Sequence, residues 1–424
     1  MTQTDDGRDP DVLVIGGGAT GAGVARDLAM RGVAVTLAER GGLSAGATGR
    51  SHGVLHSGAR YAESDPTGAA ECIAENQTLR DIAGACIADT GGLFVSLEAD
   101  DDDYFDAKRD ACREVGIEVE ELSLEAAREA VPGLSESVSR VLRVPDGVVY
   151  PSRLVAALAG DARERGACIR THAPVTDLRV EDGAIAGATV GGEHVDADVV
   201  VNAAGAWAEG CAALAGVDVP MQPTMGVMVG VDYAGVGPVL NRARSPSDGD
   251  IAVPHGGRTV LGTTSVVVDD PDEYDRDDAD IRRVIDECAQ MVPGFADAEV
   301  LDDYWGVRPL FAPDEARRVA ETDDEAGTGD ARGISREFTL LDHEEDGVAG
   351  FYSIVGGKLT THRVMAEAVA DRVCERLGVD EEGRTAETPL VGADDPGRVD
   401  ELVAEFDARS PADADVVEEA AADR

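Results

Sequence analysis

A glycine-rich turn between two apolar runs constrains the fold of this chain more than any other feature. The apolar runs cover residues 12–15 and 33–38, and a stretch of small residues over 19–30 separates them. Continuous apolar runs are typical of buried parallel strands, and the stretch between them has the length and composition of a crossover helix. The spacing therefore predicts a strand–helix–strand unit at the start of an α/β sheet.

The turn itself has the pattern G-x-G-x-x-G, with Gly16, Gly18 and Gly21. In such a turn the first glycine permits a tight bend, the second admits a pyrophosphate, and the third lets helix and strand pack closely. Glu39 ends the second run and suits the hydroxyls of a ribose. The predicted ligand is a dinucleotide with an ADP half, held at the positive end of the helix. Neighbouring residues extend the predicted site: Ala19, Thr20 and Arg40.

The segments that follow favour FAD over NAD. Residues 41–53 are small and polar without a clear period, as expected of a segment that wraps a large ligand, whereas a nicotinamide domain would continue with a helix. Much later, residues 197–207 form another apolar run that ends in small residues and a tryptophan. A distant strand returning beside the first two suits a flavin fold assembled from separated segments. The two segments contribute further predicted cofactor-binding residues: Thr48, Gly49, Ser51, His52, Gly53, Ala204, Gly205 and Trp207.

Composition indicates a protein that works in concentrated salt. The chain has 84 acidic and 37 basic residues, a net charge of −47, and only two lysines, Lys108 and Lys358. Self-repulsion of this size is screened in concentrated salt, so we expect a halophilic protein that binds neither nucleic acid nor an anionic membrane surface. The seven cysteines are scattered without metal-ligand spacing, so no metal site is expected. No apolar run approaches the roughly 18 residues of a membrane span, and the predicted location is the cytoplasm.

The order of segments predicts an α/β protein with an α+β cap. A Rossmann-type FAD-binding domain is expected from three separated parts, residues 11–90, 146–216 and 341–380. The other parts are surface helices over 91–145, a mixed or antiparallel substrate-binding cap over 217–340, and an acidic helical segment over 395–424 that we interpret as the start of a truncated C-terminal domain. Within these parts we expect helices over 69–88, 104–142 and from Gly357 to Leu377.

Several motifs make a family resemblance specific. They are Gly16–Gly23, Gly46–Tyr61, Glu71–Asn76, Val201–Trp207, Gly262–Ser265, Gly306–Leu310, Ile334–Phe338 and Gly356–Thr361. On these residues the chain resembles the FAD-dependent glycerol-3-phosphate dehydrogenases, most of all the catalytic A subunit of the anaerobic form. The resemblance implies oxidation of sn-glycerol 3-phosphate to dihydroxyacetone phosphate by hydride transfer to flavin N5. It also implies partner subunits that carry electrons to membrane quinone, and hence a peripheral membrane location.

One feature departs from that resemblance. The anaerobic A subunit usually carries a cysteine-rich C-terminal region for an iron–sulfur cluster, and no cysteine follows Cys374 here. We expect either that this region was removed or that this version lacks the cluster. The route by which electrons leave is open for the same reason.

The proposed reaction needs cations for a phosphate and a base for a hydroxyl proton. Cations in turn-rich motifs are the phosphate-binding candidates: Arg60, Arg308, Arg336 and Lys358. Lys358 stands out because the chain otherwise uses arginine, and it is also a candidate for stabilising charge near flavin N1. The residues around it are predicted to bind the cofactor: Gly356, Gly357, Leu359 and Thr360.

The base is predicted to be His56 or His255, because imidazole exchanges protons near neutral pH. A competing mechanism activates the hydroxyl with Arg60 and Tyr61. Thr264 is a candidate for holding a substrate oxygen. Two other functions stay open: a related FAD oxidoreductase acting on a 2-hydroxy acid or amino acid, and a non-catalytic flavin subunit for electron relay. A homo-oligomer is also left open.

Overall fold

The computed structural model describes residues 11–313 and 337–417, and β1 (Val12–Ile15) lies inside a six-stranded sheet. Both neighbours of β1 are parallel to it: Val14 pairs with Leu37 of β2 and with Val201 of β13. The strands follow the spatial order β20 (Phe338–Asp342), β21 (Phe351–Gly356), β13 (Val199–Asn202), β1, β2 (Val35–Ala38) and β9 (Cys168–Arg170). The strand expected to return from a distance is therefore β13, directly beside the first.

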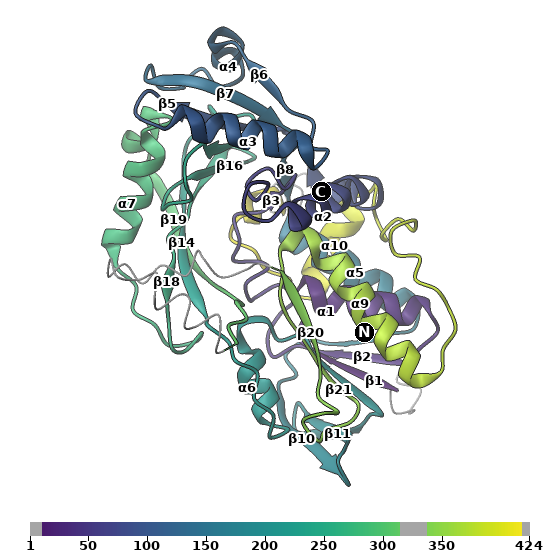
Figure 1. Ribbon diagram of the computed structural model, residues 1–424. Coiled ribbons are helices and arrows are strands. Elements are labelled where there is room, and N and C mark those ends of the chain that lie inside the picture. Colours follow the sequence, from purple (N-terminus) through teal and green to yellow (C-terminus); the bar gives the residue numbers. More distant parts are fainter. Residues whose placement is uncertain (1–10, 314–336, 418–424) are drawn as a thin grey trace.

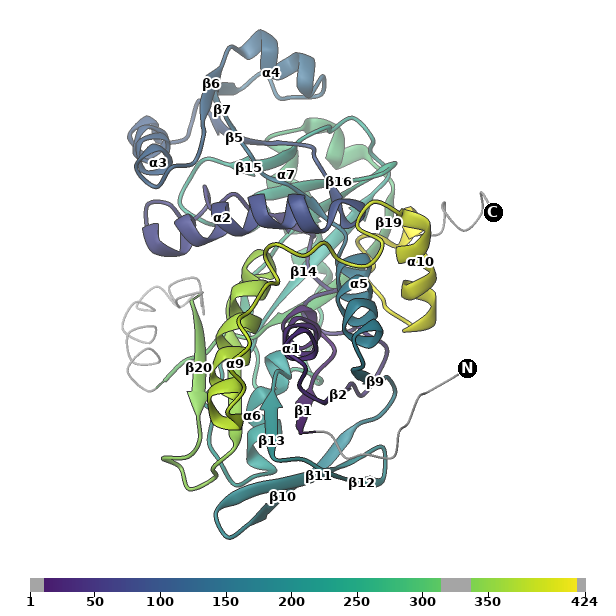
Figure 2. The ribbon, with the colours of Figure 1, turned by 90° about the vertical axis from the view of Figure 1, so that its right-hand side faces the viewer.

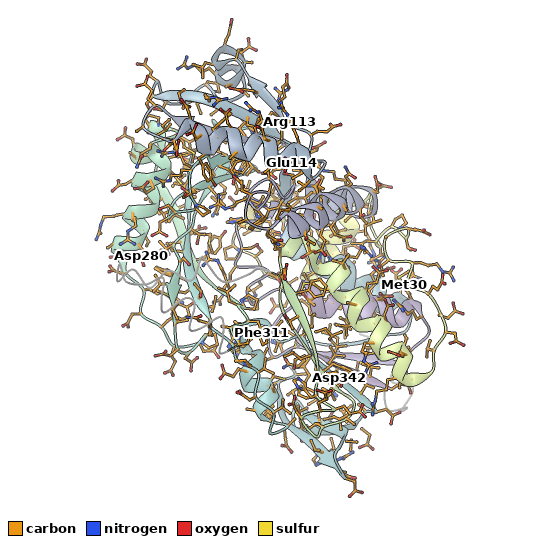
Figure 3. All side chains as sticks on the ribbon, in the orientation of Figure 1. Met30, Arg113, Glu114, Asp280, Phe311 and Asp342 are labelled. Carbon is orange, nitrogen blue, oxygen red and sulfur yellow. The ribbon has the colours of Figure 1, made fainter. Side chains whose placement is uncertain are left out.

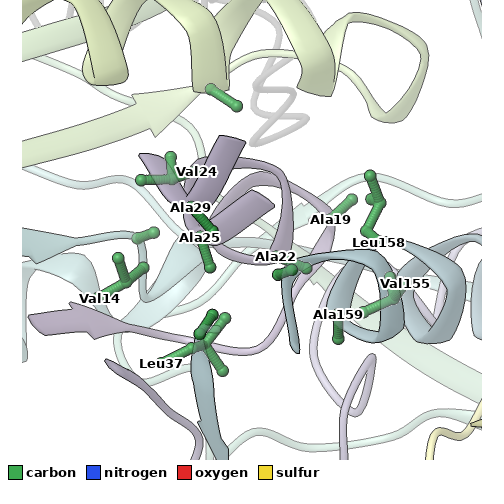
Figure 4. Close-up of a cluster of buried hydrophobic side chains, with 14 of the residues drawn as sticks. Val14, Ala19, Ala22, Val24, Ala25, Ala29, Leu37, Val155, Leu158 and Ala159 are labelled. Carbon is green, nitrogen blue, oxygen red and sulfur yellow. The ribbon is translucent and has the colours of Figure 1, made fainter. Parts of the chain in front are cut away.

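Three helices cover one face of this sheet: α1 (Ala19–Met30), α5 (Pro151–Glu164) and α9 (His362–Leu377). Figure 2 shows α1 between the other two. Small residues make this possible, since a Cβ on Gly23 would lie only 3.0 Å from the Cβ of Ala366 in α9. Figure 4 shows alanines of α1 packed in the same apolar cluster as residues of α5 and the sheet. The predicted small-residue helix over 19–30 is confirmed.

A three-stranded antiparallel meander covers the opposite face, where Leu178 and Ile185 pack with Leu13 and Phe351. It consists of β10 (Val175–Glu181), β11 (Ala184–Val190) and β12 (Glu193–Asp196). Helix α6 (Ala208–Ala213) adds Ala208 to the same cluster. Both faces of the parallel sheet are therefore buried, as its continuous apolar strands require.

A second, mostly antiparallel sheet of nine strands forms the other lobe in Figure 1. Its path is β18 (Val266–Val267), β14 (Thr224–Val231), β17 (Arg258–Gly262), β16 (Ile251–His255), β15 (Val239–Arg242), β5 (Gly92–Leu97), β7 (Val138–Val144) and β6 (Glu120–Leu122), and β19 (Val300–Arg308) pairs with β14. Helices α7 (Asp278–Ala289), α3 (Asp102–Glu114) and α4 (Leu124–Ala130) pack on this lobe. Figure 3 labels Phe311, just after β19, near the junction of the two lobes.

The expectation of helix over 104–142, broken at Pro132–Gly133, is correct only for α3 and α4, and is wrong at β6 and from Val138 onward. Residues from Val138 onward form β7, which pairs antiparallel with both β5 and β6. Arg140 and Arg143 of β7 reach Glu121 and Glu120 of β6, each at 2.8 Å. Cross-strand ion pairs and sheet hydrogen bonds thus outweigh the local helical preference of this stretch.

The remaining elements connect the lobes. Strands β3 (Val54–Leu55), β8 (Gly147–Val149) and β4 (Ile87–Ala88) form a small sheet, and α2 (Pro66–Ile82) ends before β4 rather than at residue 88. A short 3-10 turn over Leu359–Thr361 precedes α9, so the final helix begins at His362 rather than at the predicted Gly357. Helix α10 (Pro396–Glu405) begins the acidic segment, and a buried ion pair of 2.8 Å joins its Asp400 to Arg153 of α5. Across the described ranges, no helix has the length and apolar character needed to cross a membrane.

Candidate functional site

The glycine turn leaves no space for side chains at two of its three predicted positions. Gly16 has a φ of +112°, and a Cβ there would lie 2.5 Å from the carbonyl oxygen of Ala203. A Cβ on Gly21 would lie 1.9 Å from the carbonyl oxygen of Gly16. At Gly18 a Cβ would meet a single atom, the side-chain oxygen Thr48 Oγ1, at 3.2 Å, so this position is less crowded than the other two. Two glycines thus permit the packing, and the third leaves room for a ligand.

The first turn of α1 opens on a cavity. Gly18 provides no side-chain cap, and Thr48 Oγ1 accepts a hydrogen bond of 3.2 Å from the Ala19 N–H. Ala19, Thr20 and Thr48 all line the cavity. A helix start that faces open space attracts anions through its N–H groups and dipole. The geometry fits the pyrophosphate of a dinucleotide.

Glu39 stands at the end of β2, beside the glycine turn. Its carboxylate accepts hydrogen bonds from the N–H groups of Gly17, at 2.7 Å, and Gly41, at 2.9 Å. These two bonds hold the carboxylate where the sequence predicts a ribose. The binding of a ribose by Glu39 stays a prediction.

Arg40 links the end of β2 to the second lobe. Its guanidinium donates to both carboxylate oxygens of Asp272, at 3.0 and 2.8 Å, and lies 4.3 Å from the centre of the Trp207 ring. Both partners of this ion pair are half exposed. The Arg40–Asp272 pair thus joins the lobes with Trp207 beside the guanidinium, and neither Arg40 nor Trp207 lines the cavity.

A cavity of about 580 Å³ lies between the two lobes. The loop after β2, strands β14 and β19, and the turn after β21 form its walls. Predicted residues that line it are Ala19, Thr20, Thr48, Ser51, His52, His56, Arg60, Tyr61, Arg308, Gly356, Gly357, Lys358 and Leu359. Predicted residues outside its lining are Gly16, Gly18, Gly21, Glu39, Arg40, Gly49, Gly53, Ala204, Gly205, Trp207, His255, Thr264 and Thr360. Arg336 lies outside the described residues.

Lys358 projects from a glycine turn into one end of the cavity. Gly356 and Gly357 have φ values of +77° and +76°, which favour glycine. The Lys358 ammonium lies 3.4 Å from Asp65 Oδ2 and 4.7 Å from the centre of the Tyr61 ring. Its side chain is only 6% exposed, so the charge is concentrated at the cavity wall.

Two arginines line the same cavity. Arg60 follows β3 and lies 3.4 Å from the buried carboxylate of Asp250. Arg308 ends β19, and its Nη2 donates to Thr263 Oγ1 at 3.2 Å and to the Thr264 carbonyl at 2.9 Å. The structure thus brings three of the four predicted phosphate-binding cations to one cavity.

Thr264 has a different position from the predicted one. Its hydroxyl accepts a hydrogen bond of 3.2 Å from the Val227 N–H, and the residue is fully buried. Thr263 and Ser265 line the cavity instead. Successive side chains of an extended segment point to opposite sides, so a pattern centred on Thr264 selects the wrong neighbour.

The two histidines predicted as the base differ in their position relative to the cavity. His56 lines the cavity, and its ring meets the Tyr61 ring edge-on at 5.6 Å. His255 is fully buried, with Nε2 bonded to the His52 carbonyl at 2.9 Å. Burial lowers the pKa of His255 to about 4, which keeps this imidazole neutral. Because His255 does not line the cavity and its Nε2 is bonded to a carbonyl, it is poorly placed to take a proton from a substrate, and it instead anchors the loop that carries His52.

Comparison with known proteins decides the family. A family model described as FAD dependent oxidoreductase matches residues 11–372. The chain belongs to the FAD-dependent oxidoreductase family. The A1 subunit of the anaerobic glycerol-3-phosphate dehydrogenase of Haloferax volcanii is 48% identical over 420 residues, which cover 95% of this chain and 70% of that protein. The A subunit of the corresponding Escherichia coli K12 enzyme is 42% identical over 408 residues, covering 94% and 73% of the respective chains.

A solved structure agrees with the fold of this family member. The glycerol-3-phosphate dehydrogenase from Bacillus halodurans, complexed with FAD, superposes with a TM-score of 0.68 at 24% identity and covers 91% of this chain and 68% of that chain. The predicted fold class, FAD as the cofactor and the resemblance to the A subunits are confirmed.

The residues of this flavoprotein fit FAD. The glycine cradle and the open start of α1 suit its pyrophosphate, and a cavity of about 580 Å³ is in the range of cofactor sites. His362 also lines the cavity, and burial lowers its pKa to about 4. Its Nδ1 lies 2.9 Å from the Leu359 carbonyl, and its buried Nε2 has no hydrogen-bond partner in the described part of the chain. Nε2 therefore offers a lone pair to a hydroxyl of the cofactor.

Sequence reasoning alone does not single out two charged residues of this flavoprotein's cavity wall, Asp65 and Arg50. Asp65 precedes Pro66, which is a recognisable helix-start signal, but the sequence does not reveal its contact with Lys358. Arg50 lies inside the predicted cofactor-wrapping segment, and only its place on the cavity wall distinguishes it from the many other arginines.

Proposed function

We propose that this chain oxidises sn-glycerol 3-phosphate to dihydroxyacetone phosphate. One observation carries the proposal: Arg60, Arg308 and Lys358 meet at one cavity, in a chain whose net charge is −47. Concentrated positive charge in so acidic a protein suits a dianionic substrate group. The A-subunit relatives named above support the same substrate.

Arg308 is the best-placed residue to receive the phosphate. Oxygens of uncharged groups orient its guanidinium: the Thr263 hydroxyl and the carbonyls of Met225 and Thr264. A guanidinium held in this way presents its planar donor edge in a fixed direction, which favours two-pronged binding of phosphate oxygens. Lys358 and Arg60 supply further positive charge to the same cavity.

His56 is the proposed general base for the substrate hydroxyl. It lines the cavity near Tyr61, and imidazole exchanges protons in the neutral range. Bound FAD supplies the hydride acceptor. The chain's own contribution is to fix the phosphate, hold the carbinol against the cofactor site, and take up one proton at His56.

Electron exit is part of the same proposal. We propose that partner subunits take the electrons from this chain and lead them to quinone, at the cytoplasmic face of the membrane. The names of the two relatives, both subunits of a larger enzyme, support this. The purified chain alone should then reduce an artificial dye but not a quinone.

The first test is an anaerobic flavin spectrum of the purified chain in molar KCl. We expect sn-glycerol 3-phosphate to bleach the oxidised-flavin band, and glycerol and 2-hydroxy acids to leave it unchanged. A spectrum bleached by a 2-hydroxy acid or an amino acid would move the function to that substrate class. A spectrum that no such substrate changes would favour a role in electron relay.

A variant pair tests the phosphate site. Arg308→Met should lower kcat/KM for sn-glycerol 3-phosphate by about 10- to 100-fold, because a charge-assisted contact contributes about 1.5–3 kcal/mol. Arg128→Met is the control, since Arg128 lies in α4 with an exposed side chain and does not line the cavity. Equal activity of the two variants would remove Arg308 from the proposed site.

A further inference from the structure

Asp65 and Glu337 place negative charge on a cavity wall that also carries Lys358, and of these two acids Asp65 is the one paired with the lysine in the described contacts. Its segment is tightly bent: the Tyr61 N–H donates to the Gly58 carbonyl at 2.9 Å, and the Asp65 N–H donates to the Tyr61 carbonyl at 2.8 Å. The Lys358 ammonium lies near both residues of this bent segment, 4.7 Å from the centre of the Tyr61 ring and 3.4 Å from Asp65 Oδ2. Asp65 itself lines the cavity and is 22% exposed.

The two oxygens of Asp65 have different partners. Oδ1 accepts a hydrogen bond of 2.8 Å from the Gly68 N–H and so caps the start of α2. Oδ2 lies 3.4 Å from Lys358 Nζ. A Cβ on residue 68 would lie 2.0 Å from Oδ2, so glycine at that position leaves space for the carboxylate. The capping contact and the lysine contact are therefore distinct.

Capping alone does not explain a charged residue here. Asparagine caps a helix about as well as aspartate, and it would not repel a phosphate dianion. A second Asp–Pro helix start in the described part of the chain allows a comparison with Asp65. Asp395 precedes Pro396 and accepts from the Arg398 N–H at 3.1 Å, and it is exposed, far from the cavity lining. What distinguishes Asp65 from Asp395 is the lysine.

We propose that Asp65 is a positioning residue for Lys358. Its carboxylate holds the ammonium over the Tyr61 ring, so that the charge already faces the cavity before substrate enters. A pre-placed ammonium loses little conformational freedom when it meets a substrate oxygen, and this gain is realised in catalysis. The inference deepens the proposed function and rests on it.

The kinetic test uses two matched substitutions, Asp65→Asn and Asp395→Asn. Each retains a capping side chain and removes one negative charge at an Asp–Pro helix start. We expect D65N to lower kcat for sn-glycerol 3-phosphate by roughly 10- to 100-fold. KM should stay unchanged or fall, because a charge that repels phosphate is gone. D395N should match the wild type in both constants.

A purely structural role would give another pattern. If D65N leaves kcat within twofold of the wild type, or if its defect lies entirely in a raised KM, the proposal is overturned. Unfolding midpoints of the two variants, measured in the same KCl buffer, show whether capping was preserved. A failure of the proposed function looks different, since the wild-type flavin would then not respond to sn-glycerol 3-phosphate.

A second readout does not require activity. The chain has only two lysines, and Lys108 is 1% exposed and paired with Glu63 at 2.8 Å, so it serves as an internal reference. Acetylation kinetics followed by mass spectrometry should show Lys358 labelled several-fold faster in D65N than in the wild type or D395N, because its amine is released from the ion pair. Labelling at the same rate in all three proteins would overturn the proposal.

Discussion

Replacing Gly21 by alanine tests how the glycine turn builds the cofactor site. The new Cβ would lie 1.9 Å from the carbonyl oxygen of Gly16. Both atoms belong to the backbone framework, so no flexible side chain can move aside. Carbon atoms of this kind do not approach closer than 3.0 Å, and α1 must therefore move away from the turn by about 1 Å.

The expected cost follows from two opposing effects. Overpacking of this kind costs about 1–3 kcal/mol, whereas alanine is better than glycine inside a helix by about 0.5–1 kcal/mol. We expect a net loss of about 1–2 kcal/mol in the free energy of unfolding. The shift also moves the N–H groups that face the pyrophosphate, so FAD affinity should fall by on the order of tenfold or more.

The assay compares three glycine variants for FAD content after gel filtration and for unfolding by urea, all in molar KCl. Gly18→Ala should be destabilised less in urea than Gly21→Ala, because its Cβ would meet only Thr48 Oγ1 at 3.2 Å, but it should also lose FAD, because that Cβ would occupy space left for the ligand. Gly210→Ala in α6 is the control, since nothing lies within 4 Å of its Cβ. If G21A keeps wild-type FAD content and stability, the reasoning from backbone contact is refuted.

Three further outcomes are expected. His255→Gln should retain activity within about tenfold of the wild type, because the amide can replace the donor to the His52 carbonyl; a loss of more than about 100-fold would restore His255 as the base. Burial raises the pKa of Asp413 to about 6, so the native state binds this proton more tightly than the unfolded chain and loses the resulting stability as the pH rises from about 4 to 6. The stability of Asp413→Asn relative to the wild type should therefore increase by about 2 kcal/mol across that window in urea titrations, and a constant difference would contradict the burial effect. Thermal unfolding temperatures should fall steeply between molar and about 0.01 M KCl, since the Debye length rises from about 3 to 30 Å; an unchanged temperature would show that the −47 charge is balanced locally.

The sequence predicted the nucleotide-binding unit well because its signals are local. The glycine spacing, the small residues of α1 and the acid at Glu39 all lie within about thirty positions, and each has one physical meaning. The return of β13 beside β1 was also predictable, since its apolar run requires a buried position. These features can be recognised from the local sequence pattern, without knowing which distant residues they contact.

Features that depend on distant partners were harder to predict. β7 is a strand because β5 and β6 pair with it, although its own composition did not distinguish it from the helix before it. The sequence around His255 and His56 does not show which of them faces the substrate. In the structure His255 is fully buried, whereas His56 lines the cavity. Likewise, the Asp65–Pro66 dipeptide does not reveal that Asp65 contacts the ammonium of Lys358.

The central sheet has a consequence for how the protein is made. β1 leaves the ribosome first, yet its sheet is completed only by β21, some 340 residues later. At about 5–20 residues per second, roughly 7 to 30 s pass between the synthesis of β13, whose outer edge β21 covers, and the synthesis of β21 itself. The second lobe is completed during this interval and can fold first. The sheet cannot be completed until residues 351–356 have been synthesised. We therefore expect the newly made flavoprotein to depend strongly on chaperones.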